Sequence, residues 1–263
     1  MRLIGIVTLM NKPFGKLLAQ WRKHRRYSQL QLAVELDISS KHISFLETGR
    51  SIPSRDMLLK IASFLILPKR EINQWLYAAG YAPIYQELSE GDESLKLVYS
   101  AIDQMLTNHM PYPAIVMNQN WDLVQANDSA KKLMHDLGFS NHQNILEALI
   151  KDSPDTSKII NWHETASVVL TRLRHEMSLL GGSERLNELE SRLAKCFSPK
   201  QEKITSDTNQ AALCMNLNMG ENRLSFFSII AQLGAIQDVA VSEFKVELMF
   251  PSDEETKAYY QKK

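Results

Sequence analysis

The feature that most constrains this chain is a pair of predicted helices joined by a turn of about three residues. Ser28, with Gln31 three positions later, forms a capping-box pattern and predicts a helix over about residues 29–36. Ser39 is placed to cap a second helix over residues 40–48. Since so short a turn brings the two helices close together, we expect a compact helical unit.

Three further helices are predicted around this pair. Apolar spacing and caps place them at residues 14–26, 55–65 and 68–79. Asp37 in the turn and Gly49 after the pair suit the left-handed backbone that tight turns and helix ends require. The small Ala33 permits the two helices to approach closely. The sequence therefore predicts an all-α five-helix domain over residues 14–80, after a tail of residues 1–13.

Charge is distributed unevenly along the chain. Residues 1–80 hold 13 Lys/Arg against 5 Asp/Glu, a net +8, and the remaining residues hold 17 against 25, a net −8. A basic first part is typical of a domain that binds nucleic acid. A plain five-helix bundle with a basic solvated face would give the same count, so DNA binding does not follow from charge and geometry alone.

Cysteine content and hydropathy exclude several classes of protein. The two cysteines, Cys196 and Cys214, lie 18 residues apart and form no CxxC pair, which argues against a disulfide scaffold and a cysteine zinc site. No apolar run approaches the roughly 20 residues that a membrane helix needs. We therefore expect a cytoplasmic protein that does not bind a membrane.

The pattern changes after residue 80. Residues 81–110 are predicted to form a linker and a connecting helix. Short strand-like runs and helical stretches follow: strands at 114–117, 121–125, 212–217, 224–232 and 244–250, and helices at 129–137, 159–180 and 183–196. Strands at both ends with helices between them predict an α+β domain over residues 111–251. Residues 252–263 are predicted to be a polar tail.

An enzyme is the least supported alternative. Ser129 and Lys132 match a minimal Ser-x-x-Lys nucleophile pattern, but no Lys-Thr-Gly element accompanies it, and Ser129 is also placed to cap a helix. GxSxG, GxxxxGK[ST] and HExxH are all absent from the sequence. His163 and His175 are 12 residues apart and would point in different directions on a helix. We expect no enzymatic activity, no metal and no cofactor.

Specific residues in the first part of the chain carry a family resemblance. They are Phe14-Gly15, Trp21-Arg22, Ser28-Gln29-Leu30, Leu32-Ala33, Ser39, His42 through Ser51, and Pro53-Ser54-Arg55. With them the chain resembles the Cro/repressor-type (XRE) helix-turn-helix family. Asp37 is a departure, because the family's turn often has Gly there.

A second set of residues extends the resemblance to nearly the whole chain after residue 13. They are Leu67-Pro68, Arg70-Glu71, Asn73, Ala78 through Pro83, Pro111 through Ala114, Trp121-Asp122-Leu123, Asn127, Trp162, Leu173-Arg174 and Phe250 through Asp253. With them the chain is similar to regulators that carry an MmyB-like ligand-binding domain. The resemblance implies that the α+β domain has a PAS-type fold.

The helix-turn-helix resemblance implies a DNA-binding surface. The candidate residues are Gln29, Ser39, Ser40, Lys41, His42, Ser44, Phe45 and Arg50. Lys41 would donate to guanine, and Gln29 and Arg50 would contact phosphates. Core packing of Phe45 and simple solvation of Arg50 are the alternatives. Glu47 would be structural, and a buried pairing with a base such as Arg22 is a hypothesis.

The MmyB-like resemblance implies a small apolar ligand, possibly a fatty acid. The candidate ligand residues are Trp162, Val169, Leu173, Arg174, Met177 and Phe226. Arg172 and Arg174 are candidates to pair with a carboxylate head, although an ordinary core and surface ion pairs would explain the same pattern. We expect a transcription regulator that binds double-stranded operator DNA, with two half-sites, as a homodimer. The alternative is a regulator whose second domain serves only dimerisation or protein-partner binding.

Overall fold

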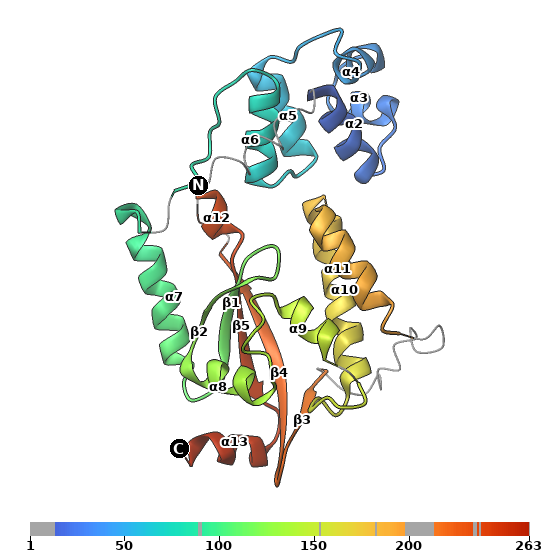
Figure 1. Ribbon diagram of the computed structural model, residues 1–263. Coiled ribbons are helices and arrows are strands. Elements are labelled where there is room, and N and C mark those ends of the chain that lie inside the picture. Colours follow the sequence, from blue (N-terminus) through green and yellow to red (C-terminus); the bar gives the residue numbers. More distant parts are fainter. Residues whose placement is uncertain are drawn as a thin grey trace. The chain divides into compact units, whose positions relative to one another are not determined.

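The computed structural model describes residues 14–88, 91–152, 154–181, 183–197, 213–233, 236 and 238–262 (Figure 1). The chain divides into two compact units, the first built mainly from residues up to Glu87 and the second mainly from residues after it. The predicted tail of residues 1–13 lies outside the described residues. In the part of the chain that is described, no helix is both long and apolar enough to cross a bilayer.

The described part of the first unit contains five helices, as the sequence predicted. They are α2 (Phe14–His24), α3 (Gln29–Glu35), α4 (Ser40–Glu47), α5 (Arg55–Phe64) and α6 (Lys69–Ala78). Ser28 and Gln31 form the capping box of α3, and the Ser39 hydroxyl accepts a hydrogen bond from the backbone N–H of His42 at the start of α4. Asp37 has a φ of 55°, so the turn adopts the left-handed conformation expected of it.

Small residues permit α2, α3 and α4 to pack closely. Gly15 on α2 lies against the end of α4, where an added Cβ would be 2.3 Å from the Glu47 carbonyl oxygen. Ala33 on α3 is 1% exposed. Around these contacts the unit has its own apolar core, which includes Leu18, Leu32, Ile43, Leu46, Leu58, Ile61, Trp75 and Leu76. Close packing against α2 and α3 and a buried apolar core therefore fix the position of α4 within the first unit.

The described strands of the second unit form one antiparallel five-stranded sheet. They are β1 (Ala114–Met117), β2 (Leu123–Ala126), β3 (Met215–Met219), β4 (Asn222–Gln232) and β5 (Lys245–Pro251), in the order β2-β1-β5-β4-β3. The first and last strands of the domain are neighbours, with Val116 opposite Val246. This α+β architecture confirms the predicted fold class.

Helices cover the two faces of the sheet unequally (Figure 1). One face packs against α8 (Asp128–Asp136), α9 (Ile145–Lys151), α10 (Trp162–Leu180), α11 (Glu184–Ala194) and α13 (Glu254–Gln261). The other face packs against η1 (Glu93–Leu95), α7 (Lys96–Asn108) and α12 (Val239–Ser242). Because alternate residues of a strand point to opposite faces, Met117 joins the first core and Val116 the second.

Three local expectations differ from the structure. The predicted polar tail contains α13, which buries Tyr260 and Thr256 in the domain. Helix α9 was not predicted from the sequence. Asn127 caps α8 by accepting from the Ala130 N–H, whereas the Ser129 hydroxyl donates to the Pro111 carbonyl at 2.5 Å.

Candidate nucleic-acid interface and ligand-binding domain

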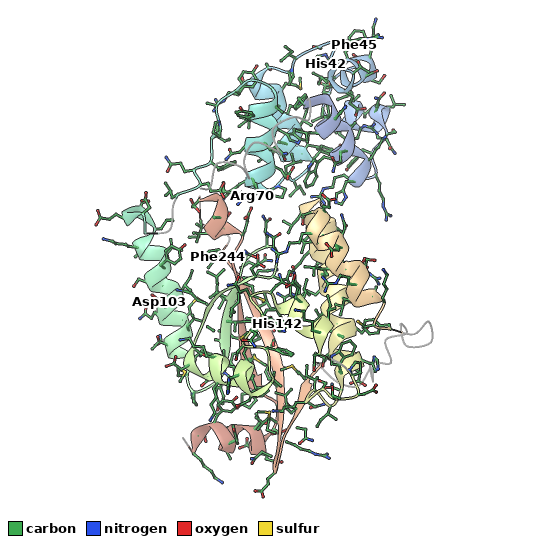
Figure 2. All side chains as sticks on the ribbon, in the orientation of Figure 1. His42, Phe45, Arg70, Asp103, His142 and Phe244 are labelled. Atoms are coloured by element: carbon green, nitrogen blue, oxygen red, sulfur yellow. The ribbon has the colours of Figure 1, made fainter. Side chains whose placement is uncertain are left out.

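Helix α4 divides into an inner and an outer face. Ile43 and Leu46 are fully buried, whereas Ser40 and Lys41 are exposed. Figure 2 labels His42 and Phe45 on this helix, and both are partly exposed. A helix that enters a DNA groove requires this division, because one face must fix it to its domain while the other meets the bases.

Two cations gather around the ring of Phe45. The Lys41 Nζ lies 5.5 Å from the ring centroid, and the guanidinium carbon of Arg50 lies 5.7 Å from it. Both distances are within the range of cation–π attraction. The structure thus brings together three predicted DNA-binding residues at one end of the domain. Phe45 serves there as a partly exposed platform for two positive charges.

A buried ion pair fixes the end of α4 to α2. Arg22 donates to both carboxylate oxygens of Glu47, at 2.6 and 3.0 Å, and to the Tyr27 carbonyl at 2.7 Å. The two side chains of the pair are 9% and 8% exposed. This confirms the hypothesis of a structural Glu47. The Gln29 side chain also donates to Glu47, at 2.7 Å, so its amide nitrogen is held at the start of α3.

The predicted apolar ligand residues lie in one cluster on the face of the sheet that packs against α8–α11 and α13. Trp162, Leu173 and Phe226 are buried in it, and Val169 and Met177 are partly buried against it. The structure therefore brings these five residues together as neighbours in a packed core.

Both arginines considered for a carboxylate head pair with glutamates of the chain. Arg174 donates to Glu190 at 2.7 Å, and Arg172 donates to Glu176 at 2.9 Å and to Glu247 at 3.0 Å. A bound carboxylate would have to compete with these partners. The arginines thus have the ion-pair partners that the sequence analysis gave as the alternative.

The pairing of Arg172 belongs to a cluster that sequence reasoning missed. Arg172 and Lys245 both lie over the Trp121 ring, at 4.4 and 4.6 Å from its centroid, and Glu176 accepts from Lys245 and from the Trp121 indole. Burial lowers the pKa of Lys245, and the adjacent Glu176 carboxylate opposes this effect. The partners are up to 124 residues apart, so local sequence carries no signal of it.

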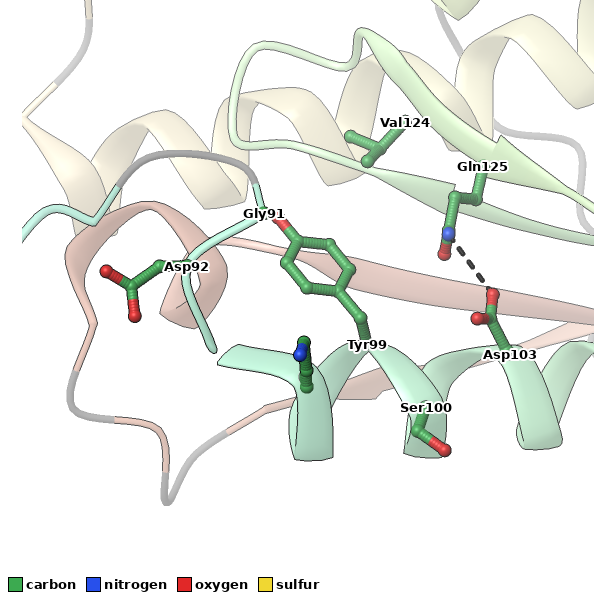
Figure 3. A pocket seen from close by; sticks show the side chains of 8 residues that line it. Gly91, Asp92, Tyr99, Ser100, Asp103, Val124 and Gln125 are labelled. Carbon is green, nitrogen blue, oxygen red and sulfur yellow. Dashed lines mark hydrogen bonds between the residues drawn. The ribbon is translucent and has the colours of Figure 1, made fainter. Parts of the chain in front are cut away.

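Two cavities in the second unit are lined by residues other than the predicted ligand residues. One is an open groove of about 550 Å³ between α7 and β2, where Gln125 donates to Asp103 at 3.2 Å (Figure 3). The other has about 260 Å³ and lies among α8, the β3–β4 hairpin and α13. None of the six predicted ligand residues lines either of these two cavities.

Comparisons with known proteins agree with this architecture. Residues 18–72 match the helix-turn-helix family model, and residues 98–262 match the model of the MmyB-like transcription regulator ligand binding domain. The chain is also similar to the HTH-type transcriptional regulator RghRB of Bacillus subtilis (strain 168). The two are 30% identical over 118 residues, which cover 44% of this chain and 83% of the relative.

A helix-turn-helix unit followed by a ligand-binding-type α+β domain defines a DNA-binding transcription regulator. Within that class, the chain belongs to the family of regulators with an MmyB-like ligand-binding domain. The second match includes α13, in agreement with the packing of this helix into the domain.

Proposed function

We propose that α4 is the recognition helix and that Ser39, Ser40, Lys41, His42 and Ser44 face the bases of an operator. The observation that carries this proposal is the division of α4 between buried Ile43 and Leu46 and its exposed opposite face. Lys41 would donate to guanine in the major groove. Gln29 and Arg50 contact phosphates, which fix the orientation of the helix but do not read sequence. Phe45 supports the two cations and meets a thymine methyl.

Two alanine variants test these roles. Lys41→Ala should reduce discrimination between operator and scrambled DNA by about 1–3 kcal/mol, because a base contact is lost. Arg50→Ala should weaken both DNAs equally and flatten the salt dependence. Lys16→Ala is the matched control, because it removes one exposed positive charge from α2, outside the proposed interface. Binding isotherms at several salt concentrations would contradict the assignment if Lys41 and Arg50 affected specificity alike.

We further propose that the second domain is of PAS type and senses a small apolar ligand with fatty-acid character. The apolar cluster that includes Trp162, Leu173, Met177 and Phe226 supports an apolar binding interior. Arg174 would supply the positive charge for an acidic head, in competition with Glu190. Mass spectrometry of lipids extracted from the purified protein tests the proposal. Reproducible recovery of one acid near one equivalent supports it, and recovery of none favours a domain that serves only protein contacts.

We propose that the regulator acts on operator DNA in the cytoplasm as a homodimer that reads two half-sites. Two recognition helices linked in one dimer gain affinity over a single one. The ligand would change DNA binding only if it favours one of two arrangements of the dimer, because equal affinity for both shifts nothing. Analytical ultracentrifugation with and without operator DNA tests the stoichiometry, and one protomer per operator would contradict it.

A further inference from the structure

Strand β4 is paired along its whole length on one side and along only part of it on the other. Residues 222–226 pair with β3, whereas the register with β5 continues from Phe226 to Gln232. Residues 228–232 therefore have β5 on one side and, among the described residues, no strand on the other (Figure 1). We call residues 228–232 the free edge of β4.

Backbone groups along the free edge alternate in direction. The Met249 N–H on β5 donates to the Pro113 carbonyl, on the side away from β4, so the adjacent Leu248 directs its own groups toward β4. Ile229 lies opposite Leu248, so its groups point to β5 and those of its neighbours point outward. The outward groups belong to Ser228, Ile230 and Gln232. In the described part of the chain, none of these N–H and C=O groups has a partner.

The free edge lacks the devices that keep exposed strands from pairing with other chains. Residues 224–233 contain no charged residue, no proline and no glycine. The described register with β5 runs without a bulge from Phe226 to Gln232. Ile229 and Ile230 are 51% and 38% exposed, on opposite faces of the sheet. A regular, uncharged edge with exposed β-branched side chains favours pairing with another strand.

The residue pattern of the free edge is complementary to a second copy of itself. In an antiparallel pair centred on Ile230, Ser228 lies opposite Gln232 of the other copy, and Ile229 lies opposite Ala231. Polar side chains then meet polar ones, apolar side chains meet apolar ones, and no two charges are opposed. Every outward N–H and C=O group also meets a partner, whereas a shifted register leaves some of them unpaired.

We propose that the free edge of β4 is the interface of the homodimer, in which the sheets of two copies join as an antiparallel pair centred on Ile230. Main-chain hydrogen bonds supply the contact, and the exposed isoleucines cover it on both faces. Such an interface is isologous and has the two-fold symmetry that two half-sites require. The inference rests on the proposed homodimer and names the surface that forms it.

Disulfide cross-linking of the full chain tests the register. Ile230→Cys would place two cysteines directly opposite each other, with Cα atoms about 5.5 Å apart, a distance that a disulfide bridges. Ser228→Cys is the matched control on the same edge, because its two copies would lie about 13 Å or more apart. Under mild oxidation we expect a covalent dimer of Ile230→Cys. We expect none of Ser228→Cys or of the wild type, which already contains Cys196 and Cys214.

Paired charge variants test the interface at equilibrium. Ile230→Lys puts two like charges opposite each other and should raise the dimer dissociation constant about a hundredfold or more, measured by analytical ultracentrifugation. Ile230→Glu should do the same, and an equimolar mixture of the two should dimerise again, because the opposed charges then attract. Leu97→Lys is the matched control, since it makes the same change at an 80% exposed position of α7, outside β4, and should dimerise as the wild type does.

The results separate this interface from the homodimer proposal itself. If the wild type is a dimer and both charge variants of Ile230 dimerise equally well, the interface lies elsewhere and the homodimer proposal stands. A mixture of the charge variants that stays monomeric, or a Ser228→Cys that cross-links as readily as Ile230→Cys, would overturn the pairing at Ile230. A wild type that is monomeric with and without operator DNA would overturn the homodimer and this interface together. Melting curves of each variant show whether it is folded.

Discussion

At the scale of single residues, the contact between Arg22 and Glu47 is the most consequential in the first unit. It combines a bidentate ion pair with low exposure, and it holds the C-terminal end of α4. Removing one partner of a buried pair leaves the other charge without compensation, at a cost of about 3–5 kcal/mol. We expect Arg22→Leu to lower the free energy of unfolding of the first unit by this amount, measured by urea denaturation.

An exposed pair provides the control for Arg22→Leu. Lys131 and Asp128 form an ion pair at 3.0 Å, but their side chains are 65% and 86% exposed. Lys131→Leu should therefore change stability by less than about 1 kcal/mol. Equal effects of the two substitutions would show that burial does not determine the contribution of the Arg22 pair.

Asp152 and Asp92 should give opposite dependences of stability on pH. Burial raises the pKa of Asp152, although the hydrogen bond that the Ser157 hydroxyl donates to it opposes this effect, whereas hydrogen bonds from Ser94 lower the pKa of Asp92. Between the usual Asp pKa of 3.8 and its raised native value, Asp152 is more protonated in the folded chain than in the unfolded chain. Its contribution to the free energy of unfolding therefore falls as pH rises through this range. Below 3.8, Asp92 loses its contribution as pH falls.

The measurement is the free energy of unfolding of each Asn variant relative to the wild type across acidic pH. As pH rises from 3.8 through the raised native pKa, the free energy of unfolding of Asp152→Asn should increase relative to that of the wild type. As pH rises through the lowered native pKa of Asp92 toward 3.8, the free energy of unfolding of Asp92→Asn should decrease relative to that of the wild type. Parallel curves for the two variants would contradict at least one of the two directions.

At the scale of elements, the sequence predicted the helix ends of the first unit well because caps are local. Ser28 and Ser39 bond to backbone groups within three residues, so their spacing is visible in the sequence. The cap of α8 was harder, because Asn127 and Ser129 are both suitable residues. Which of the two residues caps the helix depends on Pro111, 18 residues away, because its carbonyl accepts the hydrogen bond of the Ser129 hydroxyl.

Helices α9 and α13 were missed for different reasons. The seven residues of α9 are too few to separate helical from strand periodicity. The sequence of α13 is largely polar, so it shows no clear apolar face. Thr256 and Tyr260 nevertheless lie four residues apart and share the buried face of the helix. In the second domain, the partners of the candidate ligand residues are still farther away in the sequence. Arg172, for example, pairs with Glu247, and no local pattern reveals such a pair.

Deletion of residues 253–263 tests whether α13 is part of the domain. It would remove Tyr260 from the core and leave the Ser225 N–H without its acceptor, the Thr256 hydroxyl at 2.8 Å. Loss of a buried aromatic side chain alone costs about 3–5 kcal/mol, so we expect a destabilisation of at least that size. Lys257→Ala, which breaks an exposed pair on α13, should change stability by less than about 1 kcal/mol. An unchanged unfolding transition of the truncated chain would contradict a structural role for α13.

At the scale of the whole molecule, each unit has its own core and its own charge balance. The basic first part carries a net +8 and the remainder a net −8, and the two units have separate apolar clusters. Each unit has what it needs to fold independently. We expect the dimer contact of the proposed homodimer to lie in the second unit, so the linkage of two DNA-binding units would depend on that unit.

A fragment of residues 1–92 separates folding from linkage. It should show a cooperative helical unfolding transition by circular dichroism, because α2–α6 and their core lie within it. It should bind a DNA with two half-sites about a hundredfold or more less tightly than the full chain, since it loses the gain from linked binding. A DNA with a single half-site is the internal control, because the fragment and the full chain should bind it alike. If the fragment bound both DNAs as tightly as the full chain does, residues 93–263 would not link two recognition helices, and the homodimer proposal would fail while the assignment of α4 to DNA would stand.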